Sequence, residues 1–460
     1  MNNRLHMHSL SPEQRIQSFD EVNLGYRLDD AVKEAERCLH CKHQPCVSAC
    51  PVGIDIPGFI KKITEEKLDD AFHIIFRASS LPAVCGRVCP QETQCEAVCV
   101  KGIKDDPVAI GHLERFVADT FYQKQHPNPI ITPLDNRIKI AIVGSGPAGL
   151  SCAHVLLEKG YYVDIYEALH EAGGVLTYGI PAFRLPKSIV KREVQSLIDR
   201  GCHIHYDVMV GKTLTIEDLH EMGYQAIFIG TGAGLPKFMG IPGEMLSGVY
   251  SANEFLTRVN LMHAYQANAT TPIKHGKRVA VVGGGNVALD AARTALRLGA
   301  HIVYIIYRRS RYELPARLEE VIHAEEEGII FKFQTQIKEI YGNEFGNVKS
   351  IRCVDMILGE KDASGRPRPI ENSHKQMIIP VDEVIMAIGT TPNPLMIQQT
   401  KELKTTTNGC LEIDSKTMET SLPMVFAGGD VVTGSATVIL AMEAGKKAAL
   451  MMDQRLAKIH

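Results

Sequence analysis

The sequence predicts an α/β protein in which two similar units, each a parallel sheet covered by helices, follow a helical segment rich in cysteine. Two glycine-rich turns, each between a buried strand and a helix, predict the two units. Eight of the twelve cysteines lie between Cys38 and Cys99, which predicts a separate metal-binding segment near the start of the chain. A length of 460 residues agrees with about three domains.

The composition excludes several classes of function. A net charge of −3 gives no general attraction to nucleic acid or to anionic lipid, and no basic run is interleaved with aromatic residues. No apolar run approaches the ~20 residues that span a bilayer, and the N-terminus lacks the apolar core of a secretion signal. We therefore expect a soluble, cytoplasmic protein that binds neither nucleic acid nor membrane.

The first cysteine run follows an expected amphipathic helix over residues 11–37, in which Ser11 precedes a proline of the first turn. The run resembles the bacterial ferredoxin pattern with a longer middle gap, and reads Cys38-x2-Cys41-x4-Cys46-x3-Cys50-Pro51. Four thiolates this close suit an iron–sulfur cluster, because a zinc site usually shows two separated pairs of ligands. His40 and His43 keep a zinc site as the alternative.

The second cysteine run follows an expected buried helix over residues 56–76, and reads Cys85-x3-Cys89-Pro90-x4-Cys95-x3-Cys99. Two runs separated by a packing helix predict two 4Fe-4S clusters in one small helical domain. Eight ligands are needed and eight cysteines are present, but the count does not show that every cysteine is a ligand. Glu114 lies among apolar residues of the next expected helix, residues 107–122, where the alternative is a solvated glutamate. A proline-rich linker follows at residues 123–136.

The first α/β unit begins with a buried strand over residues 138–143. Its turn carries Gly144, Gly146 and Gly149 at G-x-G-x-x-G spacing, and a helix follows. These glycines allow a tight turn, a close approach of the backbone to a pyrophosphate and close helix–strand packing. About 20 residues on, a second strand ends in Glu167, which can accept a ribose hydroxyl. The pattern predicts a Rossmann-like, dinucleotide-binding unit.

The second unit repeats this pattern. A buried strand over residues 278–282 is followed by Gly283, Gly285 and Ala288 at G-x-G-x-x-A spacing, and then by a helix. A later buried strand near residues 384–388 echoes the strand that closes the first unit. The second unit is therefore also predicted to be Rossmann-like and to bind a dinucleotide.

Arg308 and Arg309 end the second strand of this unit, at the position where the first unit has Glu167. A carboxylate there would repel a 2′-phosphate, whereas guanidinium groups bind one through charge and paired hydrogen bonds. The second unit is therefore predicted to bind NADP(H) in preference to NAD(H). Two further arginines are close enough to help, Arg311 and Arg317. The alternative is a solvated basic turn that balances the acidic helix at residues 319–327, which we take as surface charge.

The first unit is predicted to hold FAD because of the chemistry that the other sites require. Nicotinamide gives up a hydride, which carries two electrons together, whereas an iron–sulfur cluster accepts one electron at a time. A flavin can do both. The cofactors carry the reaction, so no catalytic side chain is expected: no Ser-His-Asp set is visible, and no redox Cys-x-x-Cys follows the second glycine turn, unlike in thioredoxin reductases.

Three later features of the chain can contact this flavin. The loop at residues 172–186 is rich in glycine and proline, and its Arg184 is a candidate phosphate or flavin contact. The last buried strand ends before Asp430, which would face the ribityl chain; the alternative for Asp430 is a cap at the side of a helix. The helix expected over residues 437–451 would point its N-terminus at the same site and stabilise negative charge there.

After the two cysteine runs, the motifs GSGPAGL, GGVLTYGIPAFRLP, GGGNVALD, YRRS and AGGD follow in this order. The chain thereby resembles, over nearly its whole length, the family of small (beta) subunits of bacterial NADPH-dependent glutamate synthase. The GIPxFRLP and YRRS segments are the specific ones. The same plan is shared by the amino-terminal half of dihydropyrimidine dehydrogenase, its bacterial small subunit and the large subunit of the NADH-dependent ferredoxin:NADP oxidoreductase.

The resemblance implies an α-helical iron–sulfur domain at residues 1–130 and an FAD-binding domain at residues 135–250 and 391–460. The NADPH-binding domain, residues 251–390, would be inserted in the FAD-binding domain. The resemblance also implies a crossed set of cluster ligands. One cluster would be bound by Cys38, Cys41, Cys46 and Cys99. The other would be bound by Cys50, Cys89, Cys95 and Glu114, because relatives place Gln or Glu at that last position. Cys85 would then not be a ligand, although the cysteine count alone favours it.

Motifs and resemblance together define the expected nucleotide contacts. In the FAD-binding domain these are Gly144, Gly146, Pro147, Ala148, Gly149, Glu167, Gly174, Val175, Arg184, Gly429, Asp430 and Thr437. In the NADPH-binding domain they are Gly283, Gly284, Gly285, Asn286, Val287, Ala288, Arg308 and Arg309.

In glutamate synthase, the sites that hydrolyse glutamine and form glutamate from 2-oxoglutarate lie on the large (alpha) subunit. The resemblance therefore implies an NADPH-oxidising enzyme that passes electrons to such a partner in a hetero-oligomer. Two other enzymes fit the same chain: the NADPH-side subunit of a dihydropyrimidine dehydrogenase, or that of an electron-bifurcating ferredoxin:NADP transhydrogenase. The sequence does not separate them, because the acceptor site is on the partner. A non-catalytic iron–sulfur or zinc scaffold is the alternative from another class.

Overall fold

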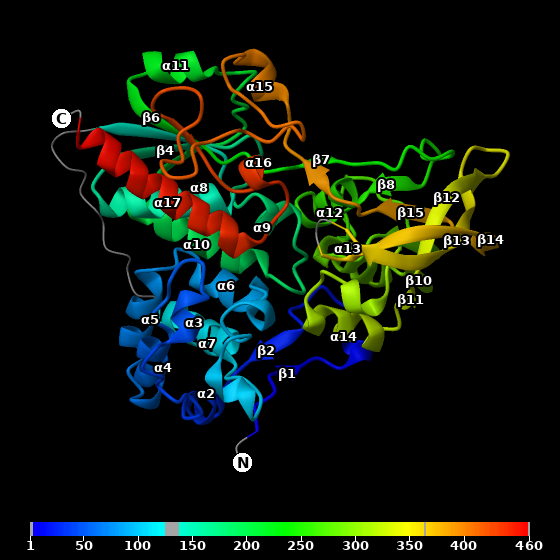
Figure 1. Ribbon diagram of the computed structural model, residues 1–460, viewed down its shortest axis with the longest axis horizontal. Coiled ribbons are helices and arrows are strands. Elements are labelled where there is room, and N and C mark those ends of the chain that lie inside the picture. Colours follow the sequence, from blue (N-terminus) through cyan, green and yellow to red (C-terminus); the bar gives the residue numbers. More distant parts are fainter. Residues whose placement is uncertain (1–2, 125–137, 363–364, 459–460) are drawn as a thin grey trace.

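The computed structural model describes residues 3–124, 138–362 and 365–458. Figure 1 shows a helical domain packed under a first α/β domain, with a second α/β domain beside both. The fold class is confirmed, because each α/β domain is built on a five-stranded parallel sheet. The boundary expected between residues 130 and 135, and nearly all of the linker at residues 123–136, lie outside the described residues.

The helical domain consists of short helices whose apolar faces form one core. Phe59, Ile60 and Ile63 of one helix pack in the same buried cluster as Phe72 and Ile75 of the next. The helices are α2 (Leu28–Ala35), α3 (Pro45–Ser48), α4 (Ile56–Thr64), α5 (Leu68–Phe76), α6 (Pro82–Val88) and α7 (Ile110–Gln123), with 3₁₀ turns at Gln91–Thr93 and Val100–Ile103.

The continuous helix expected over residues 56–76 is wrong in one respect, because it is two helices, α4 and α5. Glu66, between them, has a left-handed backbone with φ 55°, which ends the first helix. The hydrophobic spacing continues across this break, because both helices bury their apolar residues in the same core. Periodicity therefore identified the buried face correctly and missed the interruption.

The single helix expected over residues 11–37 is also wrong. Ser11 caps a short helix as expected, α1 (Pro12–Arg15), by accepting the N–H of Gln14. The chain then forms β2 (Asn23–Gly25), which pairs with β1 (His8–Ser9) before α2 begins. Residues 3–25, here called the N-terminal segment, thus run beside the domains and not as one helix.

The first α/β domain has the strand order β17-β6-β3-β4-β5. Consecutive residues of its central strand enter different cores, Ile140 and Ile142 on one face and Ala141 and Val143 on the other, as in a parallel sheet covered on both sides. Its strands are β3 (Lys139–Val143), β4 (Tyr162–Tyr166), β5 (His203–His205), β6 (Tyr224–Ile229) and β17 (Val425–Ala427). Its helices are α8 (Pro147–Glu158), α9 (Val175–Tyr178), α10 (Lys187–Asp199), α11 (Ile216–Glu221), α15 (Leu395–Gln399), α16 (Asp430–Thr433) and α17 (Val438–Leu456).

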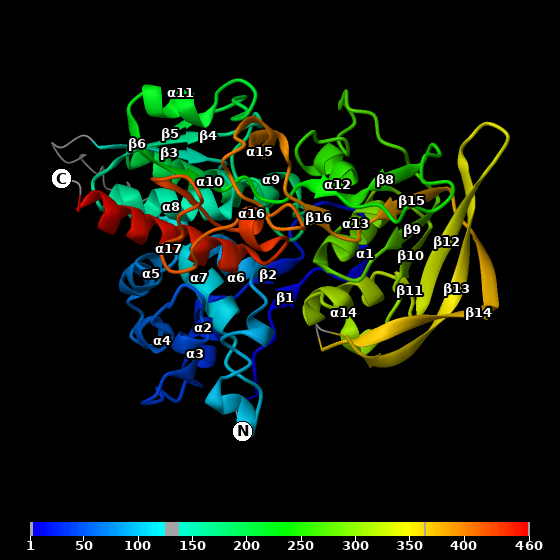
Figure 2. The same cartoon turned by 45° about the horizontal axis from the view of Figure 1, so that its top comes forward.

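The second α/β domain has the strand order β11-β10-β9-β15-β8 and carries a curved antiparallel sheet, β12-β13-β14, at its outer end (Figure 2). The parallel strands are β8 (Val249–Ser251), β9 (Arg278–Val282), β10 (Ile302–Ile306), β11 (Ile330–Lys332) and β15 (Glu383–Met386). The antiparallel strands are β12 (Thr335–Gly342), β13 (Val348–Lys361) and β14 (Pro367–Pro380). Its helices are α12 (Ala252–Asn260), α13 (Asn286–Arg297) and α14 (Leu318–Glu326).

The chain crosses between the two α/β domains twice. The outgoing segment β7 (Leu235–Pro236) pairs with the returning segment β16 (Thr390–Thr391) in an antiparallel ladder. Everything between the crossings belongs to the second domain, so one α/β domain is inserted in the other. The exact limits expected at residues 250 and 391 stay predictions.

Helices α17 and α8 pack closely because of one glycine. A Cβ atom on Gly445 would lie 2.0 Å from the carbonyl oxygen of Ala148, in the first turn of α8. We expect Gly445→Ala to lower the free energy of unfolding by about 1–3 kcal/mol, because the two helices must separate. Thermal or denaturant unfolding measures this, with Glu443→Ala, an exposed position of α17, as the control. Equal stability of the two variants would contradict the packing argument.

Candidate cofactor sites

The turn after β3 has the geometry of a phosphate cradle. Gly144 has φ +101°, and a Cβ atom there would lie 2.6 Å from the carbonyl oxygen of Gly230. A Cβ atom on Gly149 would lie 2.0 Å from the carbonyl oxygen of Gly144, so the helix packs directly on the turn. Gly146 caps α8 without a side-chain hydrogen bond, and a Cβ atom there would meet nothing within 4 Å. Pro147, the first residue of α8, has no N–H group, so the free N–H groups begin at Ala148 and open onto space that suits a pyrophosphate.

Glu167, at the end of β4, holds this turn in place. Its Oε2 atom accepts the backbone N–H of Ser145 at 2.9 Å, and its Oε1 atom accepts that of Leu169 at 2.9 Å. The next loop packs closely against the turn at Gly174, where a Cβ atom would lie 2.8 Å from the Cα atom of Gly146. Val175 then begins α9. Contacts of these residues with a ribose or a flavin stay predictions.

The C-terminal part of the chain reaches the same place. A Cβ atom on Gly429 would lie 2.9 Å from the Cβ atom of Ala148, which puts the start of α16 against the start of α8. Asp430 follows, and its Oδ1 atom accepts the backbone N–H of Ala436 at 3.2 Å. Burial raises the pKa of Asp430 to about 6. Thr437 caps the N-terminus of α17 by accepting the N–H of Leu440. Asp430 thus makes a local loop contact and also lies beside the first nucleotide turn.

The turn after β9 repeats the geometry of the first turn. Gly283 has φ +144°, and a Cβ atom there would lie 2.3 Å from the carbonyl oxygen of Ala387. Gly285 caps α13 without a side-chain hydrogen bond, and the nearest atom to a Cβ there would be 3.9 Å away. Gly284 is pressed against the Tyr307 ring. The N-terminus of α13, at Asn286, Val287 and Ala288, is therefore open to a second pyrophosphate.

The two arginines after β10 have different surroundings. Arg308 is exposed, whereas Arg309 is 4% exposed. The Nη2 atom of Arg309 pairs with Asp362 at 2.7 Å, and its Nε atom donates to the carbonyl oxygen of Pro367 at 2.9 Å. Arg309 therefore anchors the hairpin of β13 and β14, a contact that no sequence signal indicated. Its expected contact with a 2′-phosphate stays a prediction.

The two auxiliary arginines are engaged elsewhere. Arg311 pairs with Glu325 on the surface. Arg317 points to the helical domain, where it donates to the carbonyl oxygen of Arg87 at 2.7 Å and to Oε1 of Gln91 at 3.1 Å. The expectation that Arg317 helps to bind the nucleotide is therefore wrong in this arrangement of the domains.

The acidic helix at residues 319–327 is not surface charge, which corrects the sequence interpretation. Glu320 and Glu327 are buried, and both pair with Arg293, whose side chain is 0% exposed. Glu320 also pairs with Arg184 at 3.0 Å. The reason for the error is physical, since the arginine partners are distant in sequence and only the tertiary fold brings them to α14.

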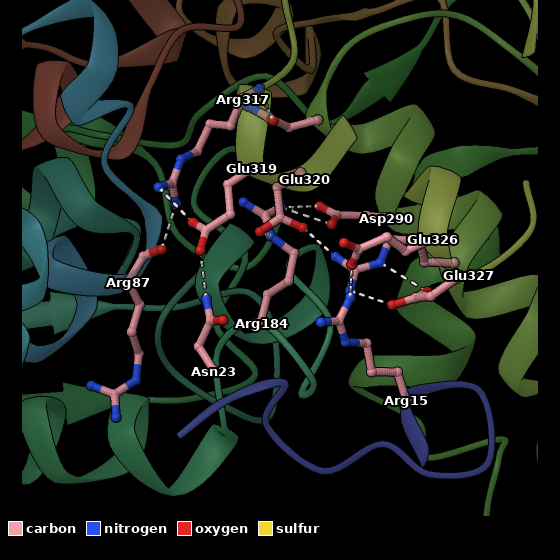
Figure 3. A network of polar contacts seen from close by, with 12 residues as sticks. Arg15, Asn23, Arg87, Arg184, Asp290, Arg317, Glu319, Glu320, Glu326 and Glu327 are labelled. Carbon is pink, nitrogen blue, oxygen red and sulfur yellow. Dashed lines mark hydrogen bonds and ion pairs between the residues drawn. The ribbon is translucent and has the colours of Figure 1, made fainter. Parts of the chain in front are cut away.

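Arg184 was expected to contact a phosphate or the flavin, but in the structure it contacts carboxylates of the protein. Its Nη1 atom donates to both carboxylate oxygens of Asp290 in α13, at 2.7 and 2.8 Å (Figure 3). With the contact to Glu320, its guanidinium is engaged by two carboxylates of the second α/β domain. A contact with the flavin stays a prediction.

The first set of cysteines surrounds one cavity in the helical domain. Its apolar wall includes Ile56, Ile60 and Ile110. Its cysteines are Cys38, Cys41, Cys46 and Cys99, from both runs of the sequence. Soft thiolates around an apolar cavity fit an iron–sulfur cluster. Among the described residues, no three or more His, Cys, Asp or Glu side chains are placed to hold a single metal ion.

The second set of cysteines lies around a buried glutamate. Glu114 in α7 is 6% exposed, and its Oε1 atom has no hydrogen-bond partner among the described residues. Burial raises its pKa to about 8. Burial, and then the nearby charges of Glu96, Glu114 and Cys50, raise the pKa of Cys95, which places Cys50 and Glu114 close to that thiol. The hydrogen bond with Cys85 lowers the pKa of Cys89, but burial and the nearby charges of Glu114, Cys95 and Cys50 raise it, and the pKa is raised overall. An unpaired carboxylate among three thiols fits a metal-bound ligand.

Cys85 is buried beside this set and has other partners. Its Sγ atom lies 3.7 Å from Oγ of Ser79 and 3.4 Å from Sδ of Met442 in α17. It also shares a hydrogen bond with Cys89. Whether Glu114 or Cys85 completes the second set stays a prediction, in favour of Glu114.

Two residues of the first α/β domain, which the sequence did not single out, hold the cysteine segments. Lys446 in α17 donates to the carbonyl oxygens of Val52, at 2.9 Å, and Ala78, at 3.1 Å. Glu193 in α10 accepts the backbone N–H of Ala83 at 2.8 Å, at the start of α6, the helix that ends just before Cys89. The second set of cysteines is thereby attached to the domain of the first nucleotide turn.

No helix among the described residues combines the length and the apolar character needed to cross a bilayer.

Comparison with known proteins gives two family matches. Residues 15–126 match the family described as dihydropyrimidine dehydrogenase domain II, 4Fe-4S cluster. Residues 138–445 match the pyridine nucleotide-disulphide oxidoreductase family.

Among curated relatives, the glutamate synthase [NADPH] small chain of Azospirillum brasilense is 34% identical over 95% of this chain and 91% of the relative. The NADP(+)-dependent formate dehydrogenase subunit beta of Moorella thermoacetica is 39% identical over 90% of this chain, but the chain spans 60% of that relative's length. The NADPH-Fe(3+) oxidoreductase subunit beta of Geobacter sulfurreducens is 36% identical, and the chain spans 63% of it.

Among solved structures, FprA of Mycobacterium tuberculosis in complex with NADPH is similar with a TM-score of 0.58 and 21% identity, over 70% of this chain and 85% of FprA. Thioredoxin reductase of T. acidophilum is similar with a TM-score of 0.51 and 22% identity, over 69% of this chain and 98% of that enzyme. These likenesses show the fold alone.

Proposed function

The chain belongs to the glutamate synthase small-subunit family within the pyridine nucleotide-disulphide oxidoreductases, and we propose that it passes electrons from NADPH through FAD and two 4Fe-4S clusters to a partner subunit. The family and its 4Fe-4S domain make it an NADPH-dependent iron–sulfur flavoprotein oxidoreductase. The number of clusters, the residues that bind them and the partner are the proposed parts.

The proposal rests on one observation. The two open nucleotide turns lie in the two α/β domains, the two cysteine sets lie in the helical domain, and the three domains are in direct contact. The turn at Gly283 and Gly285 would hold NADPH, and the turn at Gly144 and Gly146 would hold FAD. Lys446 joins the FAD-type domain to the backbone two residues after Cys50. Bound FAD would take a hydride from NADPH and release single electrons to the clusters. The chain's own task is to orient the nucleotides and to hold the cluster ligands.

The exposure of the two cysteine sets suggests the direction of the path. In the second set Cys89 and Cys95 are buried and Cys50 is partly exposed, whereas all four cysteines of the first set are partly exposed. Leu39 and Ile103, which follow Cys38 and Cys99 in the chain, are 56% and 78% exposed. Apolar side chains in contact with water beside a cluster suit a protein interface. The first set is therefore the proposed exit, where the electron-accepting partner docks.

The partner proposed first is the large subunit of glutamate synthase, because the chain spans 91% of the Azospirillum small chain. The formate dehydrogenase and Fe(3+) oxidoreductase relatives indicate that other electron acceptors are alternatives. A partner that reduces pyrimidines and a partner in electron bifurcation are further alternatives. Purification of the tagged chain from its native host decides between them. A stable, large FMN-containing amidotransferase in the eluate supports glutamate synthase, and a different stoichiometric partner rejects it.

The electron path itself is tested without a partner. We expect the purified chain, handled without oxygen, to contain flavin and iron, and NADPH to bleach its flavin absorbance within the first turnover. Reduced clusters should then give an electron paramagnetic resonance signal. NADH serves as the control and should react much more slowly. A protein that holds flavin but is not reduced by NADPH would leave the non-catalytic scaffold as the better description.

A further inference from the structure

We propose that Arg184 and Asp290 form a positioning pair that sets the nicotinamide against the flavin for hydride transfer. The inference rests on the proposed function, in which α13 binds NADPH and the first α/β domain binds FAD. Arg184 lies in the loop between α9 and α10 of the first α/β domain. Asp290 lies in the second turn of α13, the helix whose N-terminus would face the pyrophosphate of NADPH. The pair therefore joins the two nucleotide-binding parts directly.

The contact between the two residues is bidentate and buried. Nη1 of Arg184 donates to Oδ1 and Oδ2 of Asp290 at 2.7 and 2.8 Å. Their side chains are 6% and 4% exposed. A charged pair removed from water is sensitive to geometry, because loss of one partner leaves an uncompensated buried charge. A displacement of α13 relative to the loop would therefore be costly.

Further charged residues of α13 and α14 contact the Arg184 side of the pair. Glu320 in α14 contacts Nε of Arg184 at 3.0 Å and also pairs with Arg293 (Figure 3). Arg293 in turn pairs with Glu327 at 2.7 Å, and both of those side chains are 0% exposed. Positive and negative groups alternate along this chain of contacts. The guanidinium of Arg184 therefore contacts two carboxylates, one from α13 and one from α14.

The N-terminal segment and the helical domain also contact α14. Arg15 of the N-terminal segment pairs with Glu326 at 2.6 Å, and Asn23 donates to Glu319 at 3.0 Å. Arg317, at the start of α14, donates to the carbonyl oxygen of Arg87 in the helical domain. The second α/β domain is thus fixed to both other domains through one network (Figure 3). The network holds the domains in one relative orientation, which would fix the separation of the two nucleotides.

Such rigidity matters for hydride transfer, because the reacting atoms must be held in contact. A misplacement of about 1 Å can cost about 100-fold in rate. A network that served stability alone would behave differently, since its loss would change unfolding but not the rate of the folded enzyme. The two roles can therefore be separated by experiment.

The test is Asp290→Asn, which keeps the side-chain volume and removes the charge. Rapid-mixing absorbance would follow flavin reduction at saturating NADPH without oxygen. We expect a rate about 10- to 100-fold lower, unchanged affinity for NADP⁺ and loss of the long-wavelength absorbance of a stacked nicotinamide and flavin. The matched control is Asp382→Asn, because Asp382 pairs with Arg278 at the same 2.7 Å but inside one domain. The control should reduce its flavin at the original rate.

Two results would overturn the proposal: an unchanged reduction rate in the folded variant, or weaker NADP⁺ binding with an unchanged rate at saturation. If Asp290→Asn does not fold, Glu320→Gln repeats the test, because Glu320 contacts Arg184 from the opposite side; the same slowed reduction supports the pair and an unchanged rate rejects it. Failure of the proposed function is distinguishable, because the unaltered chain would then not be reduced by NADPH at all.

Discussion

Cys89→Ser should remove about half of the iron from the protein, whereas Cys85→Ser should leave the iron content unchanged. The two cysteines are four residues apart and both are buried, but their surroundings differ. Cys89 lies with Cys50, Cys95 and Glu114. Cys85 shares a hydrogen bond with Cys89, and its Sγ atom also lies against Ser79 and Met442. Loss of one of four ligands destabilises a whole cluster, and the second cluster would remain in the first cysteine set.

Iron and sulfide per flavin, measured on protein purified without oxygen, are the readout. Cys85→Ser is the matched control, since it changes the same atom one helical turn away. Glu114 offers an independent check: Glu114→Ala should lose the same cluster, and Glu114→Gln, which keeps an oxygen ligand, should retain it. Loss of iron in Cys85→Ser together with full iron in Glu114→Ala would identify Cys85 as the ligand.

Arg308→Ala combined with Arg309→Ala should weaken NADPH much more than NADH. One charge-assisted hydrogen bond to a phosphate contributes about 1.5–3 kcal/mol, which corresponds to about 10- to 100-fold in KM for NADPH. NADH lacks the 2′-phosphate and should be little affected. Steady-state KM values for both nucleotides, with any electron-accepting dye, measure the difference. Arg352→Ala, at a surface ion pair of β13, is the control.

The single variants should not be equivalent. Arg308 is exposed and can reach a bound phosphate, so we expect Arg308→Ala to carry most of the loss in NADPH affinity. Arg309 pairs with Asp362 and donates to Pro367, so Arg309→Ala should also loosen the β13–β14 hairpin and lower the melting temperature. Equal weakening of NADPH and NADH by the double variant would show that the 2′-phosphate is recognised elsewhere.

Local patterns were sufficient for the two nucleotide turns. The buried strand, the glycines at Gly144 and Gly283, and the following helix are contiguous in sequence, and backbone sterics alone demand them. The same holds for the division of the chain into a cysteine-rich helical part and two parallel sheets. Local patterns did not predict the end of α4 at Glu66. Its left-handed backbone conformation is usually signalled by a glycine, and the residue here is a glutamate.

Side chains whose partners are remote in sequence could not be predicted. The acidic residues of α14 have the composition of an exposed helix, yet Glu320 and Glu327 are buried against arginines of α13. Arg184 was expected at the flavin, yet it contacts Asp290, 106 residues away. Burial of a charged side chain is costly unless an opposite charge pairs with it. The sequence does not show which remote residue comes close enough to form that pair.

By itself, the sequence determined the fold class, the two nucleotide turns and the family, because these depend on residues that are neighbours along the chain. Only the tertiary structure decided which cysteines are buried, as Cys89 and Cys95 are, and which are partly exposed. Only the tertiary structure, too, placed Arg184 and α14 at the contact between domains, and Arg309 against the β13–β14 hairpin. Burial and charge pairing are properties of the folded molecule, since they arise when distant segments exclude water together.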